Sequence, residues 1–204
     1  ARSSEGSSTA VILRGVPRVV IVRETDEWIV MDDGVRLAAT VLRPDDDRPR
    51  PVVLEALPYR KDDATLSYRA EYARLVVEGD LAVARLDVRG TGSSGGDALD
   101  EYTEREQCDL EAVIAWLAAQ PWSTGAVGMY GMSYSGFNSL QLAARRPSAL
   151  NAIIAIYATD DRYTDDVHWC GGVLRALDLI DYPLYMVAMN ALPPVPAVWG
   201  EGWG

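Results

Sequence analysis

The feature that most constrains the fold is an apolar run that enters a serine set among small residues. The run covers residues 127–132, the serine is Ser133, and a helical pattern follows at once. This order is typical of a nucleophile elbow, in which a strand, a sharp turn and a helix hold a hydroxyl above the carboxyl end of a sheet. The positions two before and two after the serine must be small, and they are Gly131 and Ser135. Ser135 fails the same test because Phe137 follows it by two residues.

Strand and helix patterns alternate along the rest of the chain. Extended runs over residues 27–42 are joined at Asp32-Asp33-Gly34, whose Asp-Gly pair favours a tight hairpin turn. Residues 103–106 have the spacing of a helix capping box. Further strands are predicted near residues 52–54, 81–86 and 150–156, and helices near residues 67–79, 103–120 and 134–145. The order predicts an α/β fold with a mostly parallel sheet, an antiparallel N-terminal hairpin and helices on both faces.

Charge and composition narrow the class of partner. The formal net charge of -11 over 204 residues repels phosphate backbones, which argues against nucleic acid. No window has the length of an apolar membrane span, and residues 1–8 lack the apolar core of a signal peptide, so we expect a soluble, cytoplasmic protein. Cys108 and Cys170 form no metal-binding or disulfide pattern. A small-molecule partner is favoured, and no metal or organic cofactor is implied.

An acyl-transfer serine needs hydrogen-bond donors for the oxyanion that forms during attack. In a strand–elbow–helix site, one donor is the backbone N–H of the residue after the nucleophile, here Tyr134. The second donor comes from the loop after an earlier strand, and that loop contains Tyr59. A phenol can donate as an amide does, although a tyrosine taken alone is more often a half-buried packing residue.

Three motifs occur in a fixed order: residues 57–61 (LPYRK), 87–96 (DVRGTGSSGG) and 131–136 (GMSYSG). Together they resemble the X-Pro dipeptidyl-peptidase, cocaine esterase and glutaryl-acylase-like hydrolases, the CocE/NonD group. The resemblance implies an α/β-hydrolase core, a helical cap after the strand near residue 156 and a C-terminal jelly-roll domain. It also implies Ser133 as the nucleophile for an ester, amide or short peptide, with Tyr59 and the Tyr134 amide as oxyanion donors.

On this basis we divide the chain into three parts. Residues 1–16 are Ser/Gly-rich and are predicted to be a flexible tail, residues 17–159 an incomplete α/β-hydrolase core, and residues 160–204 the beginning of a helical cap. The acid and histidine of the family follow the cap, so we expect both downstream of this chain. A serine without a base is nearly inert, and we therefore expect an inactive fragment.

The single histidine and the acidic residues near it have competing interpretations. His168 lies in a segment that resembles the first cap segment of the family, so we favour a structural or substrate-facing role over that of a base. Asp160 ranks below a downstream aspartate as the triad acid. The acidic group that includes Asp166 is most simply a solvated loop. Amino-ester hydrolases of the superfamily bind a substrate ammonium with carboxylates, one of them from this region, which makes Asp166 a candidate for substrate binding.

Two further alternatives accompany this interpretation. Residues 90–95 spell G-x-G-x-x-G after a strand, as a dinucleotide site does, but no helix begins within them. We predict a loop there, in which Asp87 and Arg89 anchor structure. If the 204 residues are the whole protein, the alternative function is a non-catalytic binding or interaction module that carries a vestigial elbow.

Overall fold

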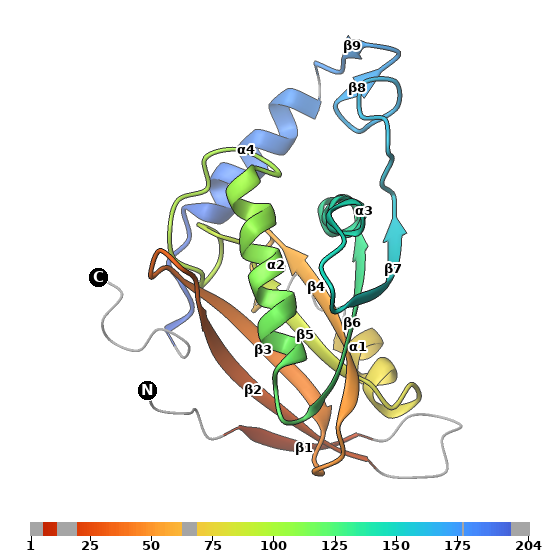
Figure 1. Cartoon of the computed structure of the whole chain (residues 1–204). Coiled ribbons are helices and arrows are strands. Elements are labelled where there is room, and N and C mark those ends of the chain that lie inside the picture. Colours follow the sequence, from red (N-terminus) through yellow and green to blue (C-terminus); the bar gives the residue numbers. More distant parts are fainter. Residues whose placement is uncertain (1–5, 12–19, 63–68, 177, 197–204) are drawn as a thin grey trace.

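The computed structural model describes residues 6–11, 20–62, 69–176 and 178–196 of the chain (Figure 1). The strands of its main sheet are β1 (Ser7–Val11), β2 (Val20–Val30), β3 (Arg36–Pro44), β4 (Arg50–Leu57), β5 (Ala82–Asp87), β6 (Ser123–Met132) and β7 (Leu150–Ile156). The α-helices are α1 (Arg69–Val77), α2 (Glu104–Ala118), α3 (Tyr134–Arg145) and α4 (Asp178–Asn190). Between β7 and α4, β8 (Trp169–Cys170) and β9 (Val173–Leu174) form a short hairpin.

The strand order in the main sheet is β1-β2-β3-β5-β4-β6-β7. Neighbours among the first four strands in this order, β1, β2, β3 and β5, pair antiparallel. The remaining pairs, β5–β4, β4–β6 and β6–β7, are parallel. The predicted hairpin turn joins β2 to β3, where Gly34 has a φ of +83° and its N–H donates to the Met31 carbonyl oxygen at 3.0 Å. The predicted sheet, mostly parallel with an antiparallel N-terminal hairpin, is confirmed.

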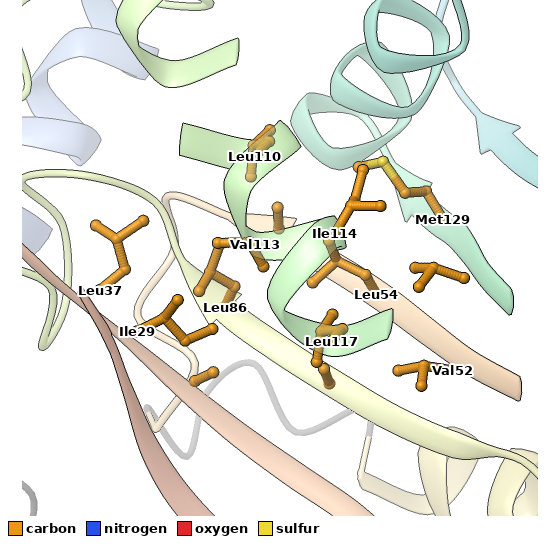
Figure 2. Packing of buried hydrophobic residues seen from close by; sticks show 14 of the residues in the cluster. Ile29, Leu37, Val52, Leu54, Leu86, Leu110, Val113, Ile114, Leu117 and Met129 are labelled. Atoms are coloured by element: carbon orange, nitrogen blue, oxygen red, sulfur yellow. The ribbon is translucent and has the colours of Figure 1, made fainter. Parts of the chain in front are cut away.

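Alternate strand residues face opposite sides of the sheet and build two hydrophobic clusters. On β4, Val52 and Leu54 belong to the larger cluster, beneath α2, whereas Val53 packs against the smaller one, beneath α1. Figure 2 shows the larger cluster, into which α2 directs Leu110, Val113, Ile114 and Leu117. Helices therefore cover both faces of the sheet, as the alternating pattern predicts.

The segment predicted to be a flexible tail contains one strand. Residues 7–11 form β1, which pairs with β2 from Ser7 opposite Glu24 to Val11 opposite Val20. The structure differs from the prediction here because the outer edge of the long strand β2 offers backbone N–H and C=O groups that an extended segment can pair. Residues 1–5 and 12–16 lie outside the described part of the chain, as does the start of the helix predicted near residues 67–79.

Helix α4 and the β8–β9 hairpin lie beyond the end of the sheet at which β4, β6 and β7 finish (Figure 1). These strands run parallel, so their carboxyl ends meet at the edge that α4 approaches. None of the helices in the described ranges has the length and apolar character to cross a membrane. The division into a core and a cap at residue 160 stays a prediction.

Ile114 tests the packing of α2 on the sheet because its side chain is completely buried there. Ile114→Ala should lower the free energy of unfolding by about 2–5 kcal/mol, since it removes buried methyl groups and leaves a cavity. Ile21 on β2 is 52% exposed, so the matched change Ile21→Ala should cost less than about 1 kcal/mol. Urea unfolding followed by circular dichroism measures both changes. Equal losses would contradict this core.

Candidate active site

Ser133 occupies the turn between β6 and α3 in a conformation that few side chains adopt. Its φ is 57° and its ψ is −118°. Its N–H donates to the Ile156 carbonyl oxygen at 2.8 Å, and its carbonyl oxygen accepts the Phe137 N–H at 2.9 Å. Such strain costs on the order of 1–3 kcal/mol and persists only where the surroundings hold it. The predicted strand–turn–helix is present, with Ser133 partly exposed at the carboxyl end of the sheet.

Small residues around Ser133 let α3 approach the sheet closely. A Cβ at Gly131 would lie 2.1 Å from the Cβ of Ser135, and a Cβ at Gly136 would lie 2.8 Å from the Ile156 carbonyl oxygen. Cβ atoms essentially never come within 3.0 Å of a non-bonded atom, so larger residues at these positions would push the helix away from the sheet. Ser135 lies inside α3 and is only 1% exposed, which leaves Ser133 as the accessible hydroxyl of the elbow.

Tyr59 follows β4 and reaches Ser133 from a different strand end. Its hydroxyl hydrogen-bonds with the side chains of Ser133 and Tyr182, and its ring meets the Tyr134 ring edge-on at 6.4 Å. Burial raises the pKa of the Tyr59 hydroxyl, while those two hydrogen bonds lower it in part. The phenol therefore keeps its proton at neutral pH, as a hydrogen-bond donor must.

The loop that carries Tyr59 is anchored by the buried carboxylate of Asp87 at the end of β5. One oxygen of Asp87 accepts the Lys61 N–H at 2.6 Å, and the other accepts the Ser93 N–H at 2.9 Å. Gly92 has a φ of +54°, and a Cβ there would lie 2.2 Å from the carboxylate. Burial raises the pKa of Asp87 to about 6. The glycine-rich segment is thus a loop in which Asp87 anchors structure, as predicted.

Arg89 has a similar structural role. Its guanidinium lies 2.6 Å from the carboxylate of Asp109 on α2 and 2.9 Å from that of Asp33 in the β2–β3 turn. These carboxylates hold the pKa of Arg89 well above its ordinary value, so the side chain stays charged. The guanidinium is therefore paired with carboxylates of the protein itself, which agrees with the predicted anchoring role.

The Tyr59 loop is also held by hydrogen bonds to the chain just beyond α4. Arg60 has a φ of +63°, an uncommon conformation for a residue with a side chain. Its guanidinium donates to the carbonyl oxygens of Leu192 at 3.0 Å and Pro193 at 2.7 Å. The residue next to Tyr59 is therefore tied to the chain just beyond α4.

Tyr134 is fixed by residues at the start of α2. Its hydroxyl donates to the carboxylate of Glu106 at 2.8 Å, and the Asn138 amide donates to the other oxygen of Glu106 at 3.1 Å. The Tyr134 ring stacks on Tyr102 with centroids 4.2 Å apart. Thr103 caps α2 by accepting the Glu106 N–H at 3.2 Å, which is one of the two hydrogen bonds of the predicted capping box. These contacts hold the residue whose backbone N–H is the predicted oxyanion donor.

His168 lies near the large cavity under α4. Its Nε2 is 3.7 Å from a carboxylate oxygen of Glu101, and its ring is 5.4 Å from the Tyr182 ring. That cavity holds about 750 Å³, whereas Ser133 and Tyr59 line a smaller pocket of about 170 Å³. The predicted reacting groups, Ser133 and Tyr59, line the smaller pocket, and His168 lines the larger cavity.

Asp166 is buried and already has partners. One carboxylate oxygen lies 2.6 Å from the Nε of Arg162, and the other accepts the Val167 N–H at 2.5 Å. Only 6% of the residue is exposed, so an ammonium group would have to replace Arg162 to reach it. Its role in substrate binding stays a prediction. Asp160 is exposed after β7.

Sequence reasoning missed two charged residues in the small pocket, Glu55 on β4 and Arg85 on β5. They are partners in the register of these parallel strands and are 7% and 4% exposed. A signal was available, because each is a single charge within an otherwise apolar strand sequence, residues 52–57 and 82–86. A charge in a buried strand is uncommon unless it is paired.

Gly131 tests whether the close approach of α3 sets the position of Ser133. Gly131→Ala should cost at least about 2 kcal/mol and displace the elbow, because its Cβ would overlap Ser135. Gly128 lies on the same strand, and a Cβ there would first meet another atom at 3.5 Å, an ordinary contact. Gly128→Ala should therefore change stability by less than about 1 kcal/mol. Thermal unfolding compares the two, and equal effects would contradict the elbow packing.

Asp87 should make stability fall as the pH rises from about 4 to about 6. Its pKa is raised from 3.8 to about 6, so over this interval the folded state keeps a proton that the unfolded state has lost. The contribution of Asp87 to the free energy of unfolding is therefore complete below pH 4. It falls by about 2–3 kcal/mol as the pH rises past 6. Asp87→Asn cannot titrate and should lack this fall. Urea unfolding from pH 4 to 7 measures it, and parallel slopes in both proteins would count against the buried carboxyl.

Comparison with known proteins agrees with this geometry. The family model described as X-Pro dipeptidyl-peptidase (S15 family) matches residues 33–195. Cocaine esterase of Rhodococcus sp. (strain MB1 Bresler) is 35% identical over 156 residues, which are 76% of this chain and 27% of that protein.

Solved structures have the same fold. A CocE/NonD family hydrolase from Staphylococcus aureus has a TM-score of 0.74 and 26% identity, covering 91% of this chain and 36% of that one. An α-amino acid ester hydrolase has a TM-score of 0.71 and 26% identity, covering 83% of this chain and 30% of that one. The chain thus spans about a third or less of the length of these hydrolases. The matches show that the chain has an α/β-hydrolase fold and belongs to the X-Pro dipeptidyl-peptidase (S15) family of hydrolases.

Proposed function

We propose that Ser133 is the nucleophile of a serine hydrolase that cleaves an ester or amide bond in a small molecule or short peptide. The observation that carries the proposal is the strained turn at Ser133, which holds its hydroxyl in one pocket with the hydroxyl of Tyr59. A serine held exposed at such a turn, beside a donor that is already in position, suits attack on a carbonyl carbon.

The reaction would use the following groups. Ser133 Oγ attacks the carbonyl carbon, and negative charge develops on the carbonyl oxygen. The Tyr59 hydroxyl and the Tyr134 backbone N–H would donate to that oxygen, where each donor is worth most because the charge exists only in the transition state. The base takes the Ser133 proton and passes it to the leaving alcohol or amine as the tetrahedral intermediate collapses and the ester or amide bond breaks. Water, which loses a proton to the same base, then attacks the acyl-enzyme, releases the acid and returns the proton to Ser133. No step requires a group other than these side chains, a base and water.

We assign the general base and its acid to sequence downstream of this chain. His168 lies beside Glu101 and lines the cavity under α4, whereas Ser133 lines the smaller pocket, so we do not assign His168 as the base. The chain covers 27% of cocaine esterase, which leaves most of the length of that relative for a base and an acid. The matched family is described as a dipeptidyl-peptidase and the relatives include esterases, so both ester and amide cleavage agree with the site.

A fluorophosphonate probe tests the proposal on the full-length protein. The probe should label Ser133 covalently, and Ser133→Ala should abolish labelling. Ser135→Ala, in the helix just after it, should still be labelled at Ser133.

Tyr59→Phe should lower kcat for p-nitrophenyl acetate by about 10²–10³-fold, because it removes one oxyanion donor and little else. The 204-residue chain alone should be slower than the full-length protein by at least about 10³-fold, since it lacks the base.

The same experiment separates the alternative function. Absence of labelling in a folded full-length protein would reject Ser133 as a nucleophile and favour a non-catalytic binding module. Labelling that survives Ser133→Ala would place the nucleophile elsewhere.

A further inference from the structure

Tyr182 on α4 places a second phenol beside the hydroxyl of Tyr59. The two hydroxyls hydrogen-bond with each other, and the Tyr59 hydroxyl also hydrogen-bonds with the side chain of Ser133. Tyr182 lines the cavity under α4, whereas Tyr59 lines the pocket of Ser133. The hydrogen bond between the phenols therefore links the linings of the two cavities. In the proposed reaction Tyr59 is an oxyanion donor, and Tyr182 has no role.

Further contacts hold Tyr182 beside the loop that contains Tyr59. The Tyr182 ring lies 5.4 Å from the His168 ring, measured between centroids, and is tilted from it by 53°. Arg60 follows Tyr59 directly, and its guanidinium donates to the Leu192 carbonyl oxygen at 3.0 Å, just beyond the end of α4. The helix and the loop are thus connected at two points, one of which is the pair of phenols.

The hydrogen bond between the phenols can run in either direction. Burial raises the pKa of both hydroxyls, so each keeps its single hydrogen at neutral pH. A phenol that donates this hydrogen can still accept another hydrogen bond on its oxygen. Tyr59 can donate to a substrate carbonyl oxygen only if its hydrogen is not donated to Tyr182. During the reaction, the hydrogen between the two phenols must therefore come from Tyr182.

We propose that Tyr182 is a positioning residue for the oxyanion site: it donates to the Tyr59 oxygen and so directs the Tyr59 hydrogen toward the substrate carbonyl. The inference rests on the proposed function, because it takes Tyr59 as an oxyanion donor. Hydrogen bonds in such a chain polarise one another, so the Tyr59 hydroxyl becomes a stronger donor when it accepts from Tyr182. The gain is largest in the transition state, when negative charge lies on the carbonyl oxygen.

Tyr182→Phe tests the proposal, because it removes the hydroxyl and keeps the ring. In the full-length protein it should lower kcat for p-nitrophenyl acetate by about three- to tenfold, as loss of one hydrogen bond would, and leave KM within about twofold. The kcat is expressed per serine labelled by the fluorophosphonate, which corrects for the amount of folded enzyme. Tyr185→Phe is the matched control, since Tyr185 lies on the same helix and is 50% exposed. Its kcat should stay within about twofold of that of the unchanged protein.

A double-mutant cycle shows whether Tyr182 acts through Tyr59. A protein with Tyr59→Phe has no hydroxyl left for Tyr182 to direct, so the further change Tyr182→Phe should alter kcat by less than about twofold. A residue that only supports the packing of α4 would lower kcat by the same factor with or without the Tyr59 hydroxyl. Equal factors in the two backgrounds would therefore overturn the proposal.

The other outcomes distinguish this proposal from the proposed function. If the fluorophosphonate does not label Ser133, the proposed nucleophile is wrong, and if Tyr59→Phe retains full kcat, the proposed oxyanion donor is wrong. If both assignments hold but Tyr182→Phe keeps the kcat of the unchanged protein, or raises only KM, the role of Tyr182 alone is overturned. Failure of Tyr182→Phe to fold would also overturn it, because the hydroxyl would then stabilise the fold rather than direct Tyr59.

Discussion

The geometry of the site depends on the hydrogen bonds that the carboxylate of Asp87 accepts from two loops. The carboxylate lies at the carboxyl end of β5, the central strand of the sheet, with no exposed surface, and its oxygens receive one N–H from the loop after β4 and one from the loop after β5. Removing a carboxylate from water is costly, and short hydrogen bonds to the charged form offset part of that cost. Because Lys61 is one of the donors, the same interaction positions the loop in which Tyr59 meets Ser133.

The features that the sequence predicts well are those set by local chemistry. The elbow depends on small residues two before and two after Ser133, and both positions are within the motif itself. The hairpin depends on the positive φ of Gly34, and the start of α2 on the hydroxyl of Thr103, three residues before Glu106. In each case the interacting residues are separated by a few positions, so the pattern of residue types contains the information.

The features that were not predicted depend on strand order. Glu55 and Arg85 are 30 positions apart, and they meet because β5 lies next to β4 in the sheet. The strand β1 likewise exists through the free edge of β2. The partner of Asp166 is a different case, because Arg162 precedes it by four residues and their pairing has a local signal. The partner of an acidic residue can therefore be a basic residue only four positions away.

The contact between Arg60 and the end of α4 also bears on how the protein acquires its site. Arg60 and Leu192 are 132 positions apart, whereas Lys61 and Asp87 are separated by 26. Closing the longer loop costs more entropy, and contacts at such separation tend to form late in folding. During synthesis the Tyr59 loop can join Asp87 well before residue 192 has left the ribosome. The final conformation of the loop depends on α4, so a lesion that loosens this helix would displace Tyr59 from Ser133 while the sheet stays folded.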